Sequence, residues 1–128
     1  MCRRSARSSA LAAALAWCAE RGIARDRVVI DPGIGFAKTT AQNLELLAAL
    51  PRLTRLAPVL VGASRKRFIG ELCGEPSAAE RLGGSVGAAV WCALRGAAVI
   101  RAHDVKATKQ ALTVACELAK LAAGNDDV

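Results

Sequence analysis

The stretch VVIDPGIGFAK, residues 28–38, decides how this sequence folds. Three β-branched residues predict a short strand over Arg27–Ile30 that is apolar on both faces, as buried parallel strands are. The strand delivers a carboxylate, Asp31, at its tip, and Pro32 and two glycines follow. Pro and Gly in this order predict a tight, constrained loop. A charged strand tip with such a loop indicates a ligand-binding edge.

Two more apolar runs end in a similar way, with helical segments between them. The strand ends fall near Asp31, Gly62 and Arg101, which are 31 and then 39 residues apart. This spacing fits βαβ units and predicts an α/β fold with parallel strands. We expect strands over Arg27–Ile30, Pro58–Val61 and Ala97–Ile100. Helices are expected over residues 10–21, over Thr39–Leu50 with a further turn opened by Pro51, and from Ser77 to about Leu94. Ser77 and Glu80 form a capping box for the third of these, and Asp104 is the N-cap of a last helix.

Helical periodicity also predicts which faces pack inward. Gly22 and Gly96 follow helices and should end them. We expect residues 1–9 to be unassigned to the fold, residues 10–123 to form the domain and residues 124–128 to be a polar tail. The apolar faces are Leu44, Leu47, Ala48 and Leu50 in one helix and Ala111, Ala115, Leu118, Leu121 and Ala122 in the last.

Composition limits the classes of function. A chain of 128 residues suits one domain, and 53% of it is hydrophobic, which is ample for a core. The net charge of +7 suggests anionic partners, although composition alone favours solvated surface charge as its explanation. With Phe36, Phe68, Trp17 and Trp91 as the whole aromatic set, a stacking platform for single-stranded nucleic acid is not expected.

The cysteines and the first residues give no functional signal. Five cysteines without a CxxC pair, beside a single histidine, do not predict a zinc site. We expect reduced, mostly buried thiols in a cytoplasmic protein. The start of the chain resembles a targeting segment, but its apolar run is too short to span a membrane and ends like an ordinary helix. No membrane partner is expected.

The polar residues at the three strand ends should form a single wall. Asp31 follows the first strand, Ser64-Arg65-Lys66-Arg67 the second, and Arg101 and His103 the third. The carboxyl ends of parallel strands share one edge, and ligands bind there. A mostly cationic wall with one carboxylate suits a ligand with a phosphate at one end and N–H donors at the other.

Each motif has a simpler interpretation. Asp31 could only cap the turn at Pro32 and Gly33. The basic residues 65–67 could be a solvated run, and the Gly-x-Gly-x-x-Lys pattern is a weak phosphate signal without the spacing of a P-loop. His103 alone would be structural, but two residues after an arginine at a strand end it favours anion binding.

Taken together, DPGIGFAK, GASRKRFIG and RAHDV, in this order, resemble the C-terminal motifs of the dihydropteroate synthase family. The resemblance covers roughly residues 10–122. It implies a (β/α)8 TIM barrel, of which this chain would be the C-terminal portion: about three βα units preceded by a helix. It also implies the condensation of p-aminobenzoate with 6-hydroxymethyl-7,8-dihydropterin pyrophosphate, giving 7,8-dihydropteroate and pyrophosphate with Mg2+.

The resemblance assigns roles to residues of the wall. Asp31, Lys66 and Arg101 would bind the pterin, and Arg101 and His103 the pyrophosphate. Phe36, Ser64 and Arg65 would meet p-aminobenzoate, while Lys38 would support the loop. No residue acts as a nucleophile, because the substrate amine attacks the pterin methylene carbon and the protein positions both partners.

The sequence also departs from the family. Ala37 stands where the family usually has Gly, an effect we expect to be small if its φ is negative. Three strands of eight are present, so we expect a fragment, a truncated gene or a late start. Residues that hold the metal would lie in the missing N-terminal part, and none is expected in this chain. Partners would be a homodimer mate through residues 77–121 or a complementing N-terminal half-barrel.

Two other functions remain open. The chain could be a non-catalytic pterin-binding fragment or half of a split enzyme, inactive or weakly active alone. A pterin-dependent methyltransferase domain would share the fold and the pterin carboxylate. The Ser-Arg-Lys and Arg-x-His motifs argue against it, since they suit p-aminobenzoate and pyrophosphate.

Overall fold

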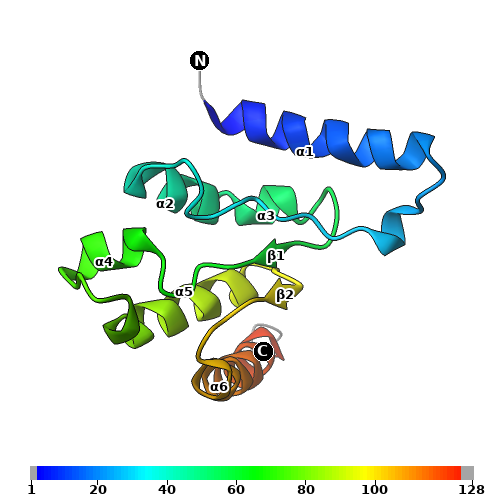
Figure 1. The fold of residues 1–128 in the computed structure, drawn as a ribbon. Helices are drawn as coiled ribbons and strands as arrows, with labels where there is room; N and C mark the ends of the chain where they lie inside the picture. The colour runs from blue at the N-terminus through cyan, green and yellow to red at the C-terminus, as the bar shows by residue number, and fades with distance from the viewer. Residues whose placement is uncertain (1–2, 125–128) are drawn as a thin grey trace.

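The computed structural model describes residues 3–124, and the last four residues of the predicted polar tail lie outside this range. Short parallel strands lie at the centre, and the helices follow one another around them from α1 to α6 (Figure 1). The helices are α1 (Arg3–Glu20), α2 (Thr40–Ala48), α3 (Leu50–Leu53), α4 (Arg67–Cys73), α5 (Leu82–Leu94) and α6 (Val105–Gly124); the 3-10 helices are η1 (Arg25–Arg27) and η2 (Ala78–Glu80).

The strands are parallel, as the spacing predicted, but shorter than expected. Strand β1 (Leu60–Val61) pairs with β2 (Val99–Ile100), with Leu60 opposite Val99 and Val61 opposite Ile100. The predicted first strand over Arg27–Ile30 is wrong: it is reduced to one parallel bridge between Ile30 and Val59. Its outer edge pairs with nothing among residues 3–124, and Val29 is half exposed, so little holds a longer strand in place.

The core lies between the strands and the surrounding helices. Leu50, Val59 and Cys92 are fully buried, and Leu15 brings α1 into the same cluster. Burial in this apolar core raises the pKa of the Cys92 thiol to about 11. The prediction of mostly buried cysteines holds only in part, because Cys73 is exposed and Cys18 and Cys116 are half-buried.

Several helix boundaries correct the sequence analysis. The helix predicted over residues 10–21 is present but begins earlier, inside the segment left unassigned: α1 runs from Arg3 to Glu20, and Gly22, whose φ is +75°, follows it. The Ser77 capping box is wrong: Ser77 only precedes the short η2, and α5 begins at Leu82. The capping box is at Thr39, whose hydroxyl accepts from the Gln42 N–H while the Gln42 side chain accepts from the Thr39 N–H. Helix α4 was not predicted.

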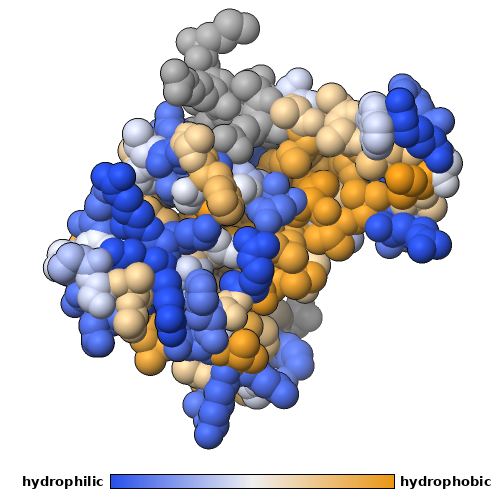
Figure 2. Space-filling view, viewed as in Figure 1, coloured by the Kyte–Doolittle hydropathy of each residue, from blue (hydrophilic) through white to orange (hydrophobic). Residues whose placement is uncertain are grey.

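The inward face predicted for the last helix is wrong in its second half. Helix α6 packs on α5 through its first turns, where Thr108 is buried and Ala111 and Ala115 are half-buried. Leu118 and Leu121 are 61% and 67% exposed. Helical periodicity therefore predicted as core an apolar face of α6 that no other described element covers. Figure 2 shows further apolar surface between α1 and the strands, on the side facing the viewer. No helix in the part of the chain the structure describes is long and apolar enough to cross a membrane.

Candidate active site

Two loops at the strand ends carry most of the predicted site. The first loop, residues 31–38, follows the Ile30 bridge, and the second loop, residues 62–66, follows β1. The structure brings them together with the end of β2. A cleft of about 390 Å3 lies at the ends of β1 and β2, lined by Gly62, Ser64, Lys66, Arg101, Ala102 and His103. The second loop and the end of β2 therefore share one cleft, whereas the first loop does not line it and approaches it through the contacts of Asp31 with Arg101 and of Phe36 with Lys66.

Asp31 caps the turn, the simpler of the two roles that the sequence left open, and it also pairs with Arg101. Its Oδ1 accepts a hydrogen bond from the Gly33 N–H at 2.8 Å, so it caps the turn. Its Oδ2 lies 3.7 Å from Nη1 of Arg101, which is an ion pair between the first loop and the end of β2. Both side chains are more than a third exposed, so the pair is worth little to stability but can exchange its partners for a ligand.

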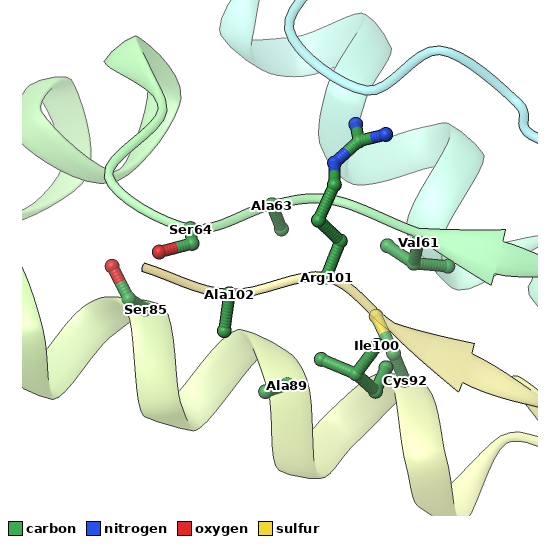
Figure 3. Close-up of a pocket in the computed structure, with 9 residues that line it drawn as sticks. All are labelled: Val61, Ala63, Ser64, Ser85, Ala89, Cys92, Ile100, Arg101 and Ala102. Atoms are coloured by element: carbon green, nitrogen blue, oxygen red, sulfur yellow. The ribbon is translucent and has the colours of Figure 1, made fainter. Parts of the chain in front are cut away.

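Strand alternation decides which way β2 points its side chains. Ile100 and Ala102 point toward α5, and Arg101 points to the opposite side (Figure 3). The space between the strand ends and α5 is only about 10 Å3, which leaves no room for a ligand. The Arg101 side chain therefore lines the cleft, while Ile100 and Ala102 pack against α5.

Missing Cβ atoms make room for the two long cations. A Cβ on Gly62 would lie 2.4 Å from Nη2 of Arg101, so the absence of a side chain there leaves the room that this guanidinium occupies. A Cβ on Gly35 would lie 2.7 Å from Cδ of Lys66, and Gly35 has a φ of +82°. Gly35 thus leaves room for the Lys66 side chain. Gly62 was missed, although it follows a predicted strand directly.

The first loop meets the second through Phe36 and Lys66. The Lys66 ammonium sits 4.1 Å from the centre of the Phe36 ring, a cation–π contact. Phe36 is 59% exposed at the edge of the site, which is unusual for an aromatic side chain without a structural task. Lys38 supports the loop as predicted: its ammonium donates to the carbonyls of Gly33 and Phe36.

Asn43 is a loop support that sequence reasoning missed. Its Oδ1 accepts from the Gly35 N–H at 2.8 Å, and its Nδ2 donates to the Thr39 carbonyl at 3.1 Å. It is only 2% exposed. A polar residue on the buried side of a helix just after a glycine-rich loop was the signal that could have found it.

The second and third strand ends are joined by two polar contacts. Ser64 Oγ lies 2.9 Å from Nδ1 of His103 and accepts from the His103 backbone N–H at 3.2 Å. Arg65 forms a two-pronged pair with Asp104, Nε to Oδ2 at 3.2 Å and Nη2 to Oδ1 at 3.0 Å. The Arg65 hydrogen bond lowers the pKa of Asp104 from its ordinary value, and the pKa of Arg65 is raised by the same bond.

The cleft does not fit a magnesium ion. Among the described residues, no three His, Cys, Asp or Glu side chains gather as a metal site. The two nearby carboxylates are already paired, Asp31 with the Arg101 guanidinium and Asp104 with that of Arg65. A divalent cation needs several oxygen ligands, and a wall of cations opposes it. No step that follows depends on a metal held by these residues.

Parallel strand tips around a cationic cleft are typical of α/β proteins that bind small ligands at their strand ends. The sequence pattern described as "Pterin binding enzyme" matches residues 4–103. This chain belongs to the pterin-binding enzyme family. The match begins inside the segment that we left unassigned, where α1 has already started.

Similar proteins confirm the resemblance to dihydropteroate synthases. The dihydropteroate synthase of Neisseria meningitidis serogroup B is 49% identical over 108 residues, which are 81% of this chain and 38% of that protein. The Escherichia coli K12 enzyme is 45% identical over 101 residues, 78% of this chain and 36% of its own length. The chain thus spans less than half the length of these relatives.

Solved structures agree with the sequence comparison. Dihydropteroate synthase from Xanthomonas albilineans in complex with 7,8-dihydropteroate is 47% identical and superposes with a TM-score of 0.87, over 89% of this chain and 44% of that one. The Thermus thermophilus enzyme in complex with 4-aminobenzoate is 41% identical, with a TM-score of 0.84, over 89% of this chain and 44% of that one.

Proposed function

We propose that this chain supplies part of the substrate site of a dihydropteroate synthase. The observation that carries the proposal is a cleft lined by Lys66, Arg101 and His103, with Asp31 paired to Arg101, in a chain with 49% identity to such an enzyme. The reaction joins p-aminobenzoate to 6-hydroxymethyl-7,8-dihydropterin pyrophosphate. The amine nitrogen forms a bond to the pterin methylene carbon, the carbon–oxygen bond to pyrophosphate breaks, and the amine loses a proton.

The pterin end of the cleft is built from a carboxylate and a lysine. Asp31 would accept two N–H bonds from the pterin ring, and each such charge-assisted bond contributes roughly 1.5–3 kcal/mol. Lys66 would donate to the pterin carbonyl and ring nitrogen. Arg101 lies against Asp31 without ligand, so binding would replace this solvent-exposed pair with contacts to the pterin.

The opposite end of the cleft is cationic and suits the leaving group. Arg101 and His103 would hold the pyrophosphate, and stabilising its departing charge is the main electrostatic task of the site. Because Ser64 Oγ contacts His103 Nδ1, the imidazole is oriented before any ligand arrives. No protein nucleophile is required, so alignment of the two substrates supplies the remaining catalysis.

For p-aminobenzoate we propose Phe36, Ser64 and Arg65. The exposed Phe36 ring offers a packing surface beside Lys66. Arg65 is engaged with Asp104, so a contact with the substrate carboxylate would share this guanidinium with Asp104. Mg2+ and cytoplasmic localisation stay predictions, with any metal ligands in a part of the enzyme outside this chain.

We further propose that these elements are the C-terminal portion of a (β/α)8 barrel. The exposed outer edge at Val29 and the short β2 support this, since closed barrels leave no unpaired edges. The exposed stripe of Val114, Leu118 and Leu121 on α6, at helical spacing, supports a dimer contact within residues 77–121. Each apolar side chain left uncovered forfeits roughly 1.5–3 kcal/mol.

The test is an assay of p-aminobenzoate incorporation with purified chain, the pterin pyrophosphate and Mg2+. We expect little or no turnover by the chain alone, because half the wall and most of the barrel are absent. Adding a separately expressed N-terminal half-barrel should produce turnover, and Arg101→Ala should abolish it. Turnover by the chain alone near that of a complete synthase would refute the fragment hypothesis.

The same assay separates the rival functions. A non-catalytic pterin-binding fragment would bind 7,8-dihydropteroate but give no product even with the N-terminal half. A pterin-dependent methyltransferase domain would bind a reduced pterin without any dependence on p-aminobenzoate. Product that requires both p-aminobenzoate and the pyrophosphate ester distinguishes the proposed synthase from both.

A further inference from the structure

The second loop has a backbone conformation that needs support. Arg65 has a φ of +59°, in the left-handed region that a residue with a Cβ rarely adopts. It lies between Ser64 and Lys66, which both line the cleft. A change of this one torsion would turn Ser64 and Lys66 away from the cleft. The groups that hold the Arg65 backbone therefore also fix the orientation of these two side chains.

Both backbone groups of Arg65 are held by α5 and the residue before it. The Arg65 N–H donates to Ser85 Oγ at 2.8 Å, and the Arg65 carbonyl accepts from Arg81 Nη1 at 2.9 Å. Ser85 is 5% exposed, and its hydroxyl donates to the Arg81 carbonyl at 2.6 Å. Arg81 and Ser85 therefore form one connected unit around the strained residue.

The Arg81 guanidinium uses its other nitrogens on the chain that leads into α5. Its Nε donates to the Glu75 carbonyl at 3.0 Å and its Nη2 to the Pro76 carbonyl at 2.7 Å. Gly70 leaves the space for it, since a Cβ there would lie 2.5 Å from Arg81 Nε. A planar fork with several fixed donors is needed for three carbonyls, and lysine cannot supply it.

We propose that Arg81 and Ser85 are positioning residues that hold Arg65 in its left-handed conformation and so aim Ser64 and Lys66 into the ligand cleft. Neither residue lines that cleft. The inference deepens the proposed function and rests on it for the identity of the ligand. The clamp itself is a statement about the backbone of Arg65 and can be tested without any ligand.

The first experiment measures amide hydrogen exchange at Arg65 by NMR in the full chain. The variants are Arg81→Gln, Arg81→Lys and Ser85→Ala, with the exposed Arg52→Gln as matched control. We expect exchange at Arg65 to rise on the order of tenfold in the three clamp variants, as for loss of one hydrogen bond. Exchange in α2 and at β1 should stay as in the control. Unchanged exchange at Arg65 in Ser85→Ala would overturn the proposal even if the arginine variants fail to fold.

The second experiment measures the affinity for 7,8-dihydropteroate by calorimetry, with the chain alone and with the N-terminal half-barrel. We expect binding to weaken about tenfold in Arg81→Lys and Ser85→Ala, measured where circular dichroism shows that both variants are folded. Faster exchange at Arg65 with unchanged affinity would overturn the positioning role. Absence of binding by the wild-type chain in both forms would instead refute the proposed function, and the exchange experiment would still decide the clamp.

Discussion

The two loops of the site are held in place in different ways. Each contains a non-glycine residue with positive φ, Ala37 at +47° in the first loop and Arg65 at +59° in the second. The first loop is braced by its own neighbours, Lys38 and Asn43. The second is braced by residues 16 to 39 positions away along the chain, in or next to α5 and α6. A locally braced loop keeps its shape as long as the next helix forms, whereas the second depends on the packing of several elements.

This difference explains which parts of the site could be predicted. The turn at Asp31 and the supporting role of Lys38 follow from residues within the motif itself, and both predictions hold. The Arg65–Asp104 pair joins segments 39 residues apart, and sequence alone cannot reveal that contact. The sequence assigned Arg65 to p-aminobenzoate because nothing local indicated that Asp104 would engage it.

In the fold too, features set by nearby residues were predicted, and features set by contacts between distant segments were not. Parallel strands and the helix ending at Gly22 are local patterns, and both are present. The Ser77 box failed because Arg81 holds residues 75 and 76 through their carbonyls, and α5 begins only after this tethered turn. The exposure of Leu118 was unpredictable because it depends on how far α5 extends beside α6.

The largest effect is expected from breaking the local brace of the first loop with Asn43→Ala. The change removes two hydrogen bonds of a buried side chain, so the free energy of unfolding should fall by about 1–2 kcal/mol. Urea denaturation followed by circular dichroism measures it. Thr113→Ala on the exposed face of α6 is the control and should stay within about 0.5 kcal/mol. Equal effects of the two changes would show that Asn43 is not a brace.

A change of opposite sign should come from Ala37→Gly. The effect of Ala37 was expected to be small if its φ were negative, but its φ is positive. The backbone is therefore strained at Ala37, and glycine should raise the free energy of unfolding by about 1 kcal/mol. The same substitution in the middle of α1, Ala12→Gly, should instead destabilise by about 1 kcal/mol. Thermal unfolding of the two variants gives the comparison. A loss of stability in Ala37→Gly would mean that this loop is not strained at Ala37.

The smallest effect tests the distant brace of the second loop by pH. Because the pKa of Asp104 is lowered in the folded chain by its bond to Arg65, the unfolded chain binds this proton first. The stability from this group is present above its ordinary pKa and is lost as the pH falls through the lowered value. Unfolding measured across the acidic range should therefore show a flatter slope for Asp104→Asn. The control is Asp26→Asn, which retains Asp104 and should show the same dependence of the free energy of unfolding on pH as the wild-type chain. Identical slopes in the wild-type chain and both variants would contradict the coupling between Asp104 and Arg65.

The central claim is that the two differently braced loops and the end of β2 form one ligand wall. The most direct measurement is the titration of isotope-labelled chain with 7,8-dihydropteroate, followed through its backbone NMR shifts. The account predicts shifts together in the first loop, in the second loop and at Arg101–His103, and little change along α6. Shifts confined to one loop, or centred on the groove lined by Leu44, Leu72 and Trp91, would contradict it.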